Sequence, residues 1–357
     1  MMRESNIKPY IQIKNRVIRE DAPCYIIAEM SANHGGEFER AIAIIHAAKA
    51  SGADAIKLQT YTADTITLDC DSEDFVLPSD NAWKDHQTLH ALYQKAYTPW
   101  EWHEALFKEA KKIGLDIFSS PFDQSAVEFL EKLDCPAYKI ASPEITDIPL
   151  IKRVALTGKP VILSTGLSTI DDIKLAIKTL ETNGCKQYAF LKCTTAYPAP
   201  LEDINLNTIP DMSKRFGCIV GISDHSLSHS VPIAALSLGA RIIEKHFVLD
   251  KYDKSVDAFF SLSPGEFTSM VREVRLIEKA LGKVNYDISP SSKKNMLARR
   301  SLYISNDIAQ GEIITTENIQ SVRPGYGLHP KYFKEVIGKK ALKPMLKGER
   351  LKLEFVE

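Results

Sequence analysis

Residues 218–247 read CIVGISDHSLSHSVPIAALSLGARIIEKHF, and two short apolar segments in this stretch each end in polar residues. The pattern predicts a strand from Cys218 to Ser223, a helix over 226–239 and a second strand from Arg241 to Phe247. A strand, a helix and a strand in succession place the two strands in parallel, as neighbours in one sheet. This unit predicts an α/β fold.

The carboxyl ends of these two strands carry two histidines and a glutamate. His225 follows the first strand, and the alternation of side chains along a strand puts Glu244 and His246 on one face of the second. Two neutral imidazoles beside a carboxylate suit a divalent ion that keeps open positions for substrate, whereas a structural zinc site takes four protein ligands. The alternative is two hydrogen-bonded histidines that bind no metal.

The strand-then-helix pattern repeats along most of the chain. Eight such units in roughly 260 residues predict a (β/α)₈ TIM barrel. The alternative is a doubly wound open sheet, but no GxGxxG motif follows the first strand. A long polar excursion, 61–99, interrupts the pattern and predicts a functional loop or lid. The predicted strands cover residues 24–30, 53–60, 115–119, 137–141, 160–165, 188–194, 218–223 and 241–247.

Polar residues end nearly all of the predicted strands, and barrel active sites are built from the carboxyl ends of strands. Three of them, Lys57, Lys139 and Lys192, together with neighbouring hydroxyls suit a small molecule that carries a phosphate and a carboxylate. Any one of these lysines could instead extend to solvent. The polar residues at strand ends are Glu29, Lys57, Gln59, Ser119, Ser120, Lys139, Ser142, Ser164, Lys192, Thr194, Ser223, His225, Glu244 and His246.

These groups predict a class of reaction. A divalent ion on the two histidines would act as a Lewis acid on a carbonyl oxygen, and Glu29 and Glu244 are placed to transfer protons. We therefore expect an anionic nucleophile to add to a carbonyl. An aldolase that forms a Schiff base on a barrel lysine is the alternative, and it would need no metal.

The last part of the chain, from residue 283 onward, differs in composition from the rest. Residues 283–297 are rich in Ser, Pro and Lys and predict a linker between a catalytic barrel, 1–282, and a small domain, 298–357. The small domain predicts short strands at 301–305, 320–323 and 350–353 and a helix near 330–337. About sixty residues bury little core, so we expect this domain to pack on another surface.

Composition excludes several kinds of partner. The 357 residues include 45 Lys and Arg against 46 Asp and Glu, and the net charge of −1 gives no long-range field for nucleic acid or membranes. The six cysteines show no paired spacing, which indicates a reducing compartment. The amino terminus lacks an apolar signal segment. These features predict a cytoplasmic enzyme that acts on small molecules.

Several strings occur in one order along the chain: IIAEMSANHGG, GADAIKLQTY, FSSPFD, YKIAS, KCTTAYP, GISDH, IEKHF and SVRPGYGLHP. In this order they resemble the nonulosonic (sialic) acid synthases. The resemblance implies condensation of phosphoenolpyruvate with an open-chain 2-acetamido sugar aldehyde, with a divalent ion of the Mn²⁺ or Mg²⁺ type. It also implies that the small domain is similar to the SAF (antifreeze-like) fold.

The resemblance assigns roles residue by residue. It makes His225 and His246 the metal ligands, Glu29 the acid/base carboxylate, and Glu244 the residue that orients substrate beside the metal. Phosphoenolpyruvate would contact Lys57, Lys139, Ser142, Ser164 and Ser223, and Ser120 stands where a hydroxyl residue is usual. The sugar would contact Gln59, Tyr197 and Asp257. Thr195 stands where many acetylneuraminate synthases carry a sugar-contacting Asn, so this chain departs from them there, and Thr194 is a hydroxyl of the predicted anion site. The arginine that matches Arg323 reaches the sugar from the partner chain, which implies a domain-swapped homodimer.

Other strings, TYTADTITL, SEDFVL and RPGYGLHPKYF, look most like the pseudaminic acid synthases. Their acceptor is a 2,4-diacetamido-2,4,6-trideoxy hexose of altro configuration. The alternative is an N-acetylneuraminate or legionaminate synthase, which would use N-acetylmannosamine or its diacetamido 6-deoxy relative. An apolar contact from Phe75, Trp83 or Tyr97 could favour a 6-methyl group, or these residues could simply pack a lid.

An ice-binding or carbohydrate-binding role for residues 298–357 is the remaining alternative. The many charges of this segment, among them Lys339 and Lys340, suit a flat apolar face poorly, and likeness of fold does not transfer function.

Overall fold

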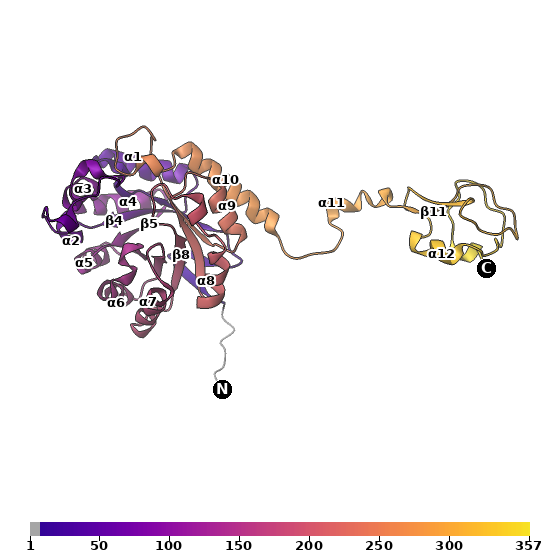
Figure 1. Ribbon diagram of the computed structural model, residues 1–357, viewed down its shortest axis with the longest axis horizontal. Helices are drawn as coiled ribbons and strands as arrows, with labels where there is room; N and C mark the ends of the chain where they lie inside the picture. The colour runs from indigo at the N-terminus through magenta and orange to yellow at the C-terminus, as the bar shows by residue number, and fades with distance from the viewer. Residues whose placement is uncertain (1–7) are drawn as a thin grey trace. The chain divides into compact units, whose positions relative to one another are not determined.

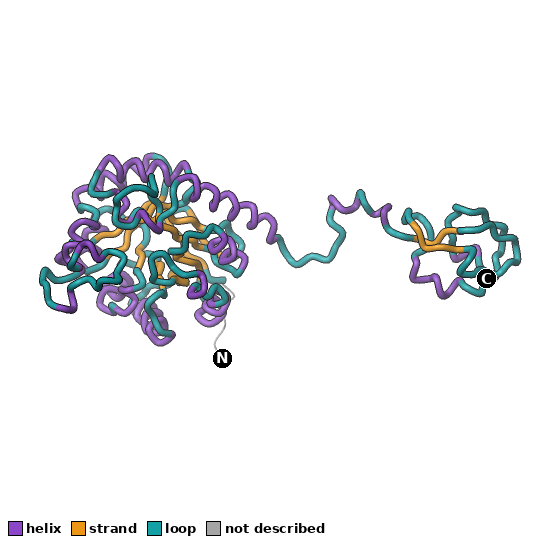
Figure 2. The backbone as a smooth tube through the Cα atoms, turned by 45° about the horizontal axis from the view of Figure 1, so that its top comes forward, coloured by secondary structure: helices purple, strands orange, loops and turns teal. Residues whose placement is uncertain are grey.

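The computed structural model describes residues 8–357, which divide into two compact units, one ending at Gly282 and the other spanning Lys283–Glu357. The first unit is a closed barrel of eight parallel strands with helices around it (Figure 1). The second consists mainly of loops and turns around two short strands (Figure 2). The TIM-barrel prediction is therefore confirmed.

The barrel strands follow one another in chain order around the ring, and the last strand, β10, closes it against the first, β3. All eight lie within two residues of their predicted bounds, because strands buried on both faces form continuous apolar runs that are easy to delimit. They are β3 (Tyr25–Glu29), β4 (Ala55–Thr60), β5 (Asp116–Pro121), β6 (Tyr138–Ile140), β7 (Val161–Ser164), β8 (Tyr188–Cys193), β9 (Ile219–Asp224) and β10 (Ile242–His246).

The helices of the first unit pack apolar faces on the barrel. Local capping defines several of their starts: the Asp123 side chain accepts hydrogen bonds from two backbone amides at the start of α5, and Thr169 forms a capping box with Asp172 at the start of α7. The helices are α1 (Phe38–Ala50), α2 (Ala63–Ile66), α3 (Leu89–Ala96), α4 (His103–Lys112), α5 (Gln124–Lys132), α6 (Ile148–Ala155), α7 (Ile170–Thr182), α8 (Thr208–Phe216), α9 (Ser230–Ser237) and α10 (Pro264–Leu281). Within residues 8–357, no helix is both long enough and apolar enough to cross a membrane.

Several elements of this unit were not predicted, among them the short helices α2 and α3 within the excursion. The hairpin of β1 (Tyr10–Ile13) and β2 (Arg16–Arg19) lies in a segment interpreted as a polar lead-in, yet its isoleucines are buried in the core. The alternation in YIQI was the missed signal. Helix α8 was also missed, although its buried Ile209 and Met212 and the left-handed Gly217 at its end are typical helix signals.

Gly221 in β9 brings the two histidine-bearing strands close together. A Cβ at this position would lie 2.3 Å from the carbonyl oxygen of Ile242 in β10. Only glycine fits at this position, so Gly221 is the residue that allows β9 and β10 to lie so close together.

The second unit has a small core of ten buried apolar residues around β11 (Ser301–Ile304) and β12 (Ile319–Val322), which pair antiparallel. The predicted strand at 350–353 is reduced to one bridge between Tyr303 and Arg350. The predicted helix near 330–337 is a 3₁₀ turn followed by α12 (Phe333–Val336), and a further short helix, α11 (Pro290–Lys293), lies earlier in this unit.

Candidate active site

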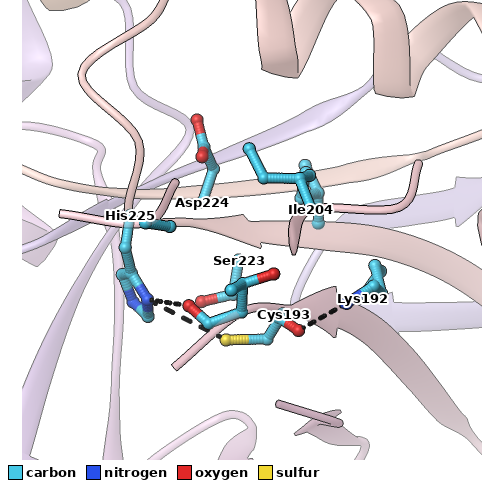
Figure 3. Close-up of a pocket in the computed structure, with 9 residues that line it drawn as sticks. Lys192, Cys193, Ile204, Ser223, Asp224 and His225 are labelled. Atoms are coloured by element: carbon cyan, nitrogen blue, oxygen red, sulfur yellow. Dashed lines mark hydrogen bonds between the residues drawn. The ribbon is translucent and has the colours of Figure 1, made fainter. Parts of the chain in front are cut away.

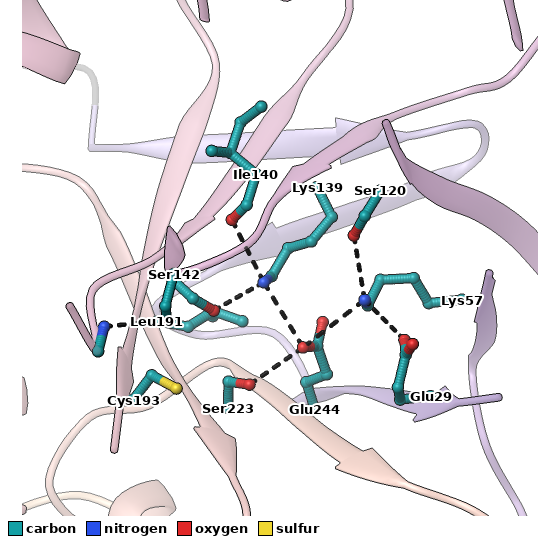
Figure 4. A network of polar contacts seen from close by, with 12 residues as sticks. Glu29, Lys57, Ser120, Lys139, Ile140, Ser142, Leu191, Cys193, Ser223 and Glu244 are labelled. Atoms are coloured by element: carbon teal, nitrogen blue, oxygen red, sulfur yellow. Dashed lines mark hydrogen bonds and ion pairs between the residues drawn. The ribbon is translucent and has the colours of Figure 1, made fainter. Parts of the chain in front are cut away.

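Four charged side chains from four different strands meet inside the carboxyl end of the barrel (Figure 4). We call Glu29, Lys57, Lys139 and Glu244 the charge cluster; each is at most 4% exposed. Lys57 Nζ lies 2.6 Å from Glu29 Oε2 and 4.0 Å from Glu244 Oε1, and Lys139 Nζ lies 3.6 Å from the same Glu244 oxygen. The predicted convergence of Lys57 and Lys139 is therefore present in the structure.

Serine hydroxyls from neighbouring strands complete the hydrogen bonds of this cluster. Lys57 donates to Ser120 Oγ at 3.1 Å and Lys139 donates to Ser164 Oγ at 2.7 Å. Ser223 donates to Glu244 Oε1 at 3.0 Å. Ser142 accepts a hydrogen bond from the backbone amide of Gly166 at 3.0 Å. The cluster thus offers ammonium groups and hydroxyls to an anion in a site sheltered from water.

Within the charge cluster, the pKa values of Glu29 and Glu244 are shifted in opposite directions. Burial raises the pKa of Glu29, although Lys57 opposes the shift. Burial acts in the same direction on Glu244, but Lys139 and Lys57 outweigh it and lower the pKa of that carboxyl. Glu244 is therefore the anionic partner of the two lysines, and Glu29 is the carboxyl of the two that takes up a proton more readily.

The third predicted lysine of the cradle does not join the charge cluster. Lys192 is only half-buried, and its Nζ donates to the carbonyl oxygen of its neighbour Cys193 at 2.7 Å (Figure 3). Burial lowers the pKa of Lys192. Its side chain turns to the backbone of its own strand, because no carboxylate faces it as Glu244 faces the other two lysines.

The two histidines lie beside the charge cluster with ring centroids 5.3 Å apart. The Nδ1 of His225 lies 3.0 Å from the carbonyl oxygen of Thr194 and therefore carries a proton, so that in the neutral ring Nε2 holds the lone pair. His246 Nδ1 is buried without a hydrogen-bond partner. Burial also lowers the pKa of His246 well below its usual value, so its ring is neutral.

These donors fit a divalent ion with open coordination positions. An orphaned, buried imidazole nitrogen beside a second oriented imidazole is what such an ion would use. Across residues 8–357, no group of three or more His, Cys, Asp or Glu side chains is placed to hold a metal ion. A closed structural site is therefore not formed by the described side chains.

A buried ion pair stands directly behind His225. Lys245 is fully buried, and its Nζ lies 2.6 Å from Asp224 Oδ2. It also donates to the carbonyl oxygen of Ser226, and Asp224 accepts from the Ser226 amide at 2.9 Å. The pair holds the residues on both sides of His225 and so fixes the direction of its ring.

Aromatic side chains also pack against the two histidines. We call Trp83, Tyr197 and Phe260 the aromatic cluster. The Tyr197 ring lies 4.5 Å from that of His225, and the Phe260 ring lies 4.7 Å from that of His246. Trp83 belongs to the long excursion; its ring lies 5.2 Å from that of Tyr197, and its Nε1 donates to the Val256 carbonyl at 2.9 Å.

Phe75, Trp83 and Tyr97 were the aromatic residues expected to favour a 6-methyl group. Among these three described residues, only Trp83 makes ring contacts with Tyr197 and Phe260. Within the described chain, Phe75 and Tyr97 form no ring contact with the aromatic cluster. The Trp83 ring therefore joins the excursion to the aromatic cluster, and the Val256 carbonyl in the loop after β10 anchors that ring.

A polar bridge joins the charge cluster to the loop after β10. Gln59 Nε2 donates to Glu29 Oε1 at 3.0 Å and to Ser31 Oγ at 2.9 Å. Ser31 in turn donates to Asp257 Oδ2 at 2.5 Å, and this oxygen lies 4.0 Å from His246 Nδ1. The predicted residues Gln59 and Asp257 thus share one partner, Ser31, which the sequence analysis did not single out.

The carboxyl end of the barrel thus combines the charge cluster, which suits an anion, with two buried histidines that fit a divalent ion. The aromatic cluster packs against these histidines. The model of the NeuB family matches residues 44–286, and that of the SAF domain matches residues 299–357. The chain belongs to the NeuB family. The family and the SAF domain inferred from the sequence are confirmed.

Named relatives agree with this membership. The pseudaminic acid synthase of Campylobacter jejuni is 46% identical over 332 residues, which cover 93% of this chain and 96% of the relative. The pseudaminic acid synthase of Helicobacter pylori is 43% identical, with 94% of this chain and 98% of the relative covered. A crystal structure of N-acetylneuraminic acid (sialic acid) synthetase from Leptospira borgpetersenii has a TM-score of 0.71 at 29% identity and covers 81% of this chain and 95% of that chain.

Thr194, Thr195 and Arg323 were also predicted for this NeuB-family site. The Thr194 hydroxyl donates to the Asp203 carbonyl at 3.2 Å, so it is the Thr194 backbone that serves the site, through His225. Thr195 lies close to Gly166, where a Cβ would meet its Oγ1 at 2.1 Å. Arg323 follows β12 in the second unit and is exposed.

Glu144 is a titratable residue near the charge cluster that the sequence analysis passed over. Its Oε2 is buried without a hydrogen-bond partner. Burial raises its pKa to about 7, while Lys139 acts in the opposite direction. The signal was its position two residues after Ser142, past the end of a barrel strand, where polar residues face the site.

Proposed function

We propose that this chain condenses phosphoenolpyruvate with a 2,4-diacetamido-2,4,6-trideoxy hexose of altro configuration to give pseudaminic acid and phosphate. The observation that carries the proposal is the 46% and 43% identity to two pseudaminic acid synthases, each over more than nine-tenths of the chain. The charge cluster beside two histidines supplies the chemistry that this reaction needs.

The charge cluster suits phosphoenolpyruvate. Lys57 and Lys139 would hold its phosphate and carboxylate through charge-assisted hydrogen bonds, and Ser120, Ser164 and Ser223 would add hydroxyl contacts. In the reaction, carbon 3 of phosphoenolpyruvate bonds to the aldehyde carbon of the sugar, and water adds to the cationic carbon 2. The bond from carbon 2 to the phosphate oxygen then breaks, and phosphate leaves.

Glu29 is the residue that we assign to proton transfer. Its pKa is raised by burial, and it contacts both Lys57 and Gln59, so it lies between the phosphoenolpyruvate and the sugar sides of the site. Such a carboxyl suits the transfer of a proton to the aldehyde oxygen or from the attacking water.

We assign His225 and His246 as the residues that would hold a divalent ion of the Mn²⁺ or Mg²⁺ type. When bound there, the ion would supply a Lewis acid for the aldehyde oxygen. The protein contributes the orientation: Thr194 and the pair of Asp224 and Lys245 fix the His225 ring, and Glu244 lies beside the same rim.

The aromatic cluster supports a 6-deoxy acceptor. Tyr197 and Phe260 pack on the histidines, where the sugar aldehyde would lie, and Trp83 packs on these two rings farther from the histidines, where carbon 6 at the other end of the open-chain sugar would reach. An apolar surface favours a 6-methyl group over a 6-hydroxymethyl group, because the hydroxyl would lose its water without gaining a hydrogen-bond partner.

The test is an assay of phosphate release from phosphoenolpyruvate with a panel of sugars. We expect the highest kcat/KM with the altro-configured diacetamido sugar, below it the diacetamido relatives of other configuration, and the lowest with N-acetylmannosamine. A preference for N-acetylmannosamine or for the precursor of legionaminate would move the enzyme to the alternative branch. Trapping of the enzyme by borohydride with pyruvate, without need of a metal, would instead indicate a Schiff-base aldolase.

We also propose that the active form is a domain-swapped homodimer, in which Arg323 contacts the sugar bound in the partner's barrel. Charge supports this: the segment from Lys283 onward holds fourteen Lys and Arg against eight Asp and Glu, whereas the rest of the chain holds thirty-one against thirty-eight. The turn after Arg323 is also rigid, because Ser301 Oγ donates to the Pro324 carbonyl at 2.7 Å and accepts from the Gly327 amide at 2.8 Å.

Complementation tests the homodimer. A chain with Arg323→Ala and a chain with His246→Ala should each be inactive, but mixed dimers should regain one working site. Absence of recovery, despite measured exchange of subunits, would mean that Arg323 acts in its own chain or not at all.

The cysteines support a cytoplasmic location as part of the proposal. All six are free, and five of them are buried. Free thiols persist in a reducing compartment, where an enzyme that makes an activated sugar precursor from phosphoenolpyruvate would work.

A further inference from the structure

Ser31, at the start of the turn that follows β3, has a backbone conformation that is unfavourable for serine. Its φ of +44° lies in the left-handed region, which glycine tolerates and residues with a Cβ avoid. Five of the described residues other than glycine have a positive φ: Lys14, Ser31, Gln87, Asp134 and Asn205. Of these five, only Ser31 is buried. A buried and strained residue at a site where glycine would fit indicates that its side chain has a function.

The Ser31 hydroxyl is the shared partner of two residues on the sugar side of the site. It donates its hydrogen to Asp257 Oδ2 at 2.5 Å and accepts a hydrogen bond from Gln59 Nε2 at 2.9 Å. Gln59 belongs to β4 and Asp257 to the loop after β10, so the hydroxyl connects two elements that are distant in the chain. The serine itself is 4% exposed, and these hydrogen bonds are therefore shielded from water.

The contact with Ser31 fixes which way the Gln59 amide faces. Both hydrogens of the amide are used, one by Ser31 and the other by Glu29 Oε1 at 3.0 Å. The amide oxygen is left as the acceptor for a hydroxyl or acetamido N–H of a ligand. Asp257 is held in a comparable way, because its Oδ2 accepts a hydrogen bond from the Ser31 hydroxyl. The same Oδ2 lies 4.0 Å from His246 Nδ1.

We propose that Ser31 is a positioning residue for the acceptor sugar, and that its hydroxyl holds Gln59 and Asp257 in the orientation that binds the sugar. This inference rests on the proposed function and adds a residue to it. Ser31 acts through its two partners and touches neither of the lysines that would bind phosphoenolpyruvate. Loss of the hydroxyl therefore weakens binding of the sugar and leaves binding of phosphoenolpyruvate intact.

Two variants separate the hydroxyl from the strained backbone. Ser31→Ala removes the hydroxyl but keeps a Cβ at a positive φ, whereas Ser31→Gly removes both the hydroxyl and the strain. The glycine variant should melt about 2–4 °C above the alanine variant, because glycine adopts this backbone conformation freely. Both variants should nevertheless show the same kinetic defect.

The expected defect is an increase of about tenfold in the KM for the diacetamido sugar, the size of effect that loss of one buried hydrogen-bonded group produces. The KM for phosphoenolpyruvate should stay within about twofold of wild type. Asp134→Gly is the matched control, because Asp134 also has a positive φ, +55°, but is exposed on the turn after α5. It should raise the melting temperature and leave both KM values unchanged.

Three results would overturn the inference: an unchanged sugar KM in Ser31→Ala, recovery of the sugar KM in Ser31→Gly, or a parallel increase of both KM values in the two variants. Recovery in the glycine variant would assign the effect to the backbone, and a parallel increase would assign it to general disruption of the site. Failure of the wild-type enzyme with all of the sugars would instead overturn the proposed function, so the two failures are distinguishable.

Discussion

The charge cluster and the aromatic cluster both lie beside the same two histidines but are built in different ways. Each member of the charge cluster, Glu29, Lys57, Lys139 and Glu244, stands on a barrel strand. In the aromatic cluster, Trp83 comes from the long excursion, Tyr197 follows β8, and Phe260 lies in the loop after β10. One side is therefore fixed by strand register, and the other depends on loops.

This difference has a functional consequence. Strand register holds charged groups to a few tenths of an ångström, which suits a substrate common to a whole family, here phosphoenolpyruvate. Loops can change in length and sequence without loss of the barrel, so they suit the part of the site that selects among sugars. Substitutions on the two sides should accordingly have effects of different kinds.

The largest effect is expected at the histidines, where the two clusters meet. His225→Ala or His246→Ala should lower kcat by about a thousandfold or more at saturating Mn²⁺, because either change removes half of the protein ligands that we propose. Calorimetric titration of Mn²⁺ should show the loss of binding directly. The matched control is His90→Ala on α3, which should bind Mn²⁺ and turn over normally. Full activity of a wild-type enzyme stripped with a chelator would contradict the metal site.

The next effect concerns the lysines. Lys139→Met should lower kcat/KM for phosphoenolpyruvate by about a hundredfold or more, because a buried charge-assisted hydrogen bond to an anion is lost. Lys192→Met should cost at most about threefold, since Lys192 bonds only to a backbone carbonyl in this structure. Both variants are to be checked for folding by thermal melts. Equal losses would mean that Lys192 enters the site when substrate binds.

A smaller effect is expected in the aromatic cluster. Trp83→Ala should lower the preference for the 6-deoxy sugar over its 6-hydroxy counterpart by about tenfold, the range that one apolar contact provides. Its effect on the KM for phosphoenolpyruvate should be slight. Phe75→Ala, on the same excursion but outside the aromatic cluster, serves as the control. If both variants lose the preference equally, the excursion acts as a lid rather than through the indole ring.

The smallest effect is a dependence of stability on pH at Glu144. Burial raises its pKa from 4.5 to about 7, so between these values the folded protein keeps a proton that the unfolded chain has released. Stability is therefore lost as pH rises through this window, and the loss is complete above pH 7. Glu144→Gln removes the titration, and its melting temperature relative to wild type should rise by about 2–4 °C from pH 5 to pH 8.

The control for this prediction is Glu128→Gln, which replaces an exposed carboxylate on α5. Its melting temperature should keep a constant difference from wild type over the same pH range. A constant difference for Glu144→Gln as well would mean that the Glu144 carboxyl is solvated in solution.

Much of the barrel and of the charge cluster could be predicted from the sequence, because both depend on local geometry. A strand alternates its side chains between two faces, and parallel strands align their carboxyl ends, so Glu29, Lys57, Lys139 and Glu244 had to approach one another once eight strand–helix units were recognised. The hairpin at Tyr10–Arg19 and helix α8 were equally local, and they were missed only because weak patterns were passed over.

The sequence by itself determined which residues reach the rim, since periodicity and chain order are properties of the backbone. Only the tertiary structure decided what each of them does there. Lys192 has the same strand-end position as Lys139 but turns to a backbone carbonyl, and Trp83 rather than Phe75 or Tyr97 packs on Tyr197 beside the histidines. Ser31 bridges Gln59 and Asp257, which are separated by almost two hundred residues. Long side chains and loops can contact several partners that are distant in the chain. Packing and burial in the folded protein, rather than the local sequence, determine which of these contacts form.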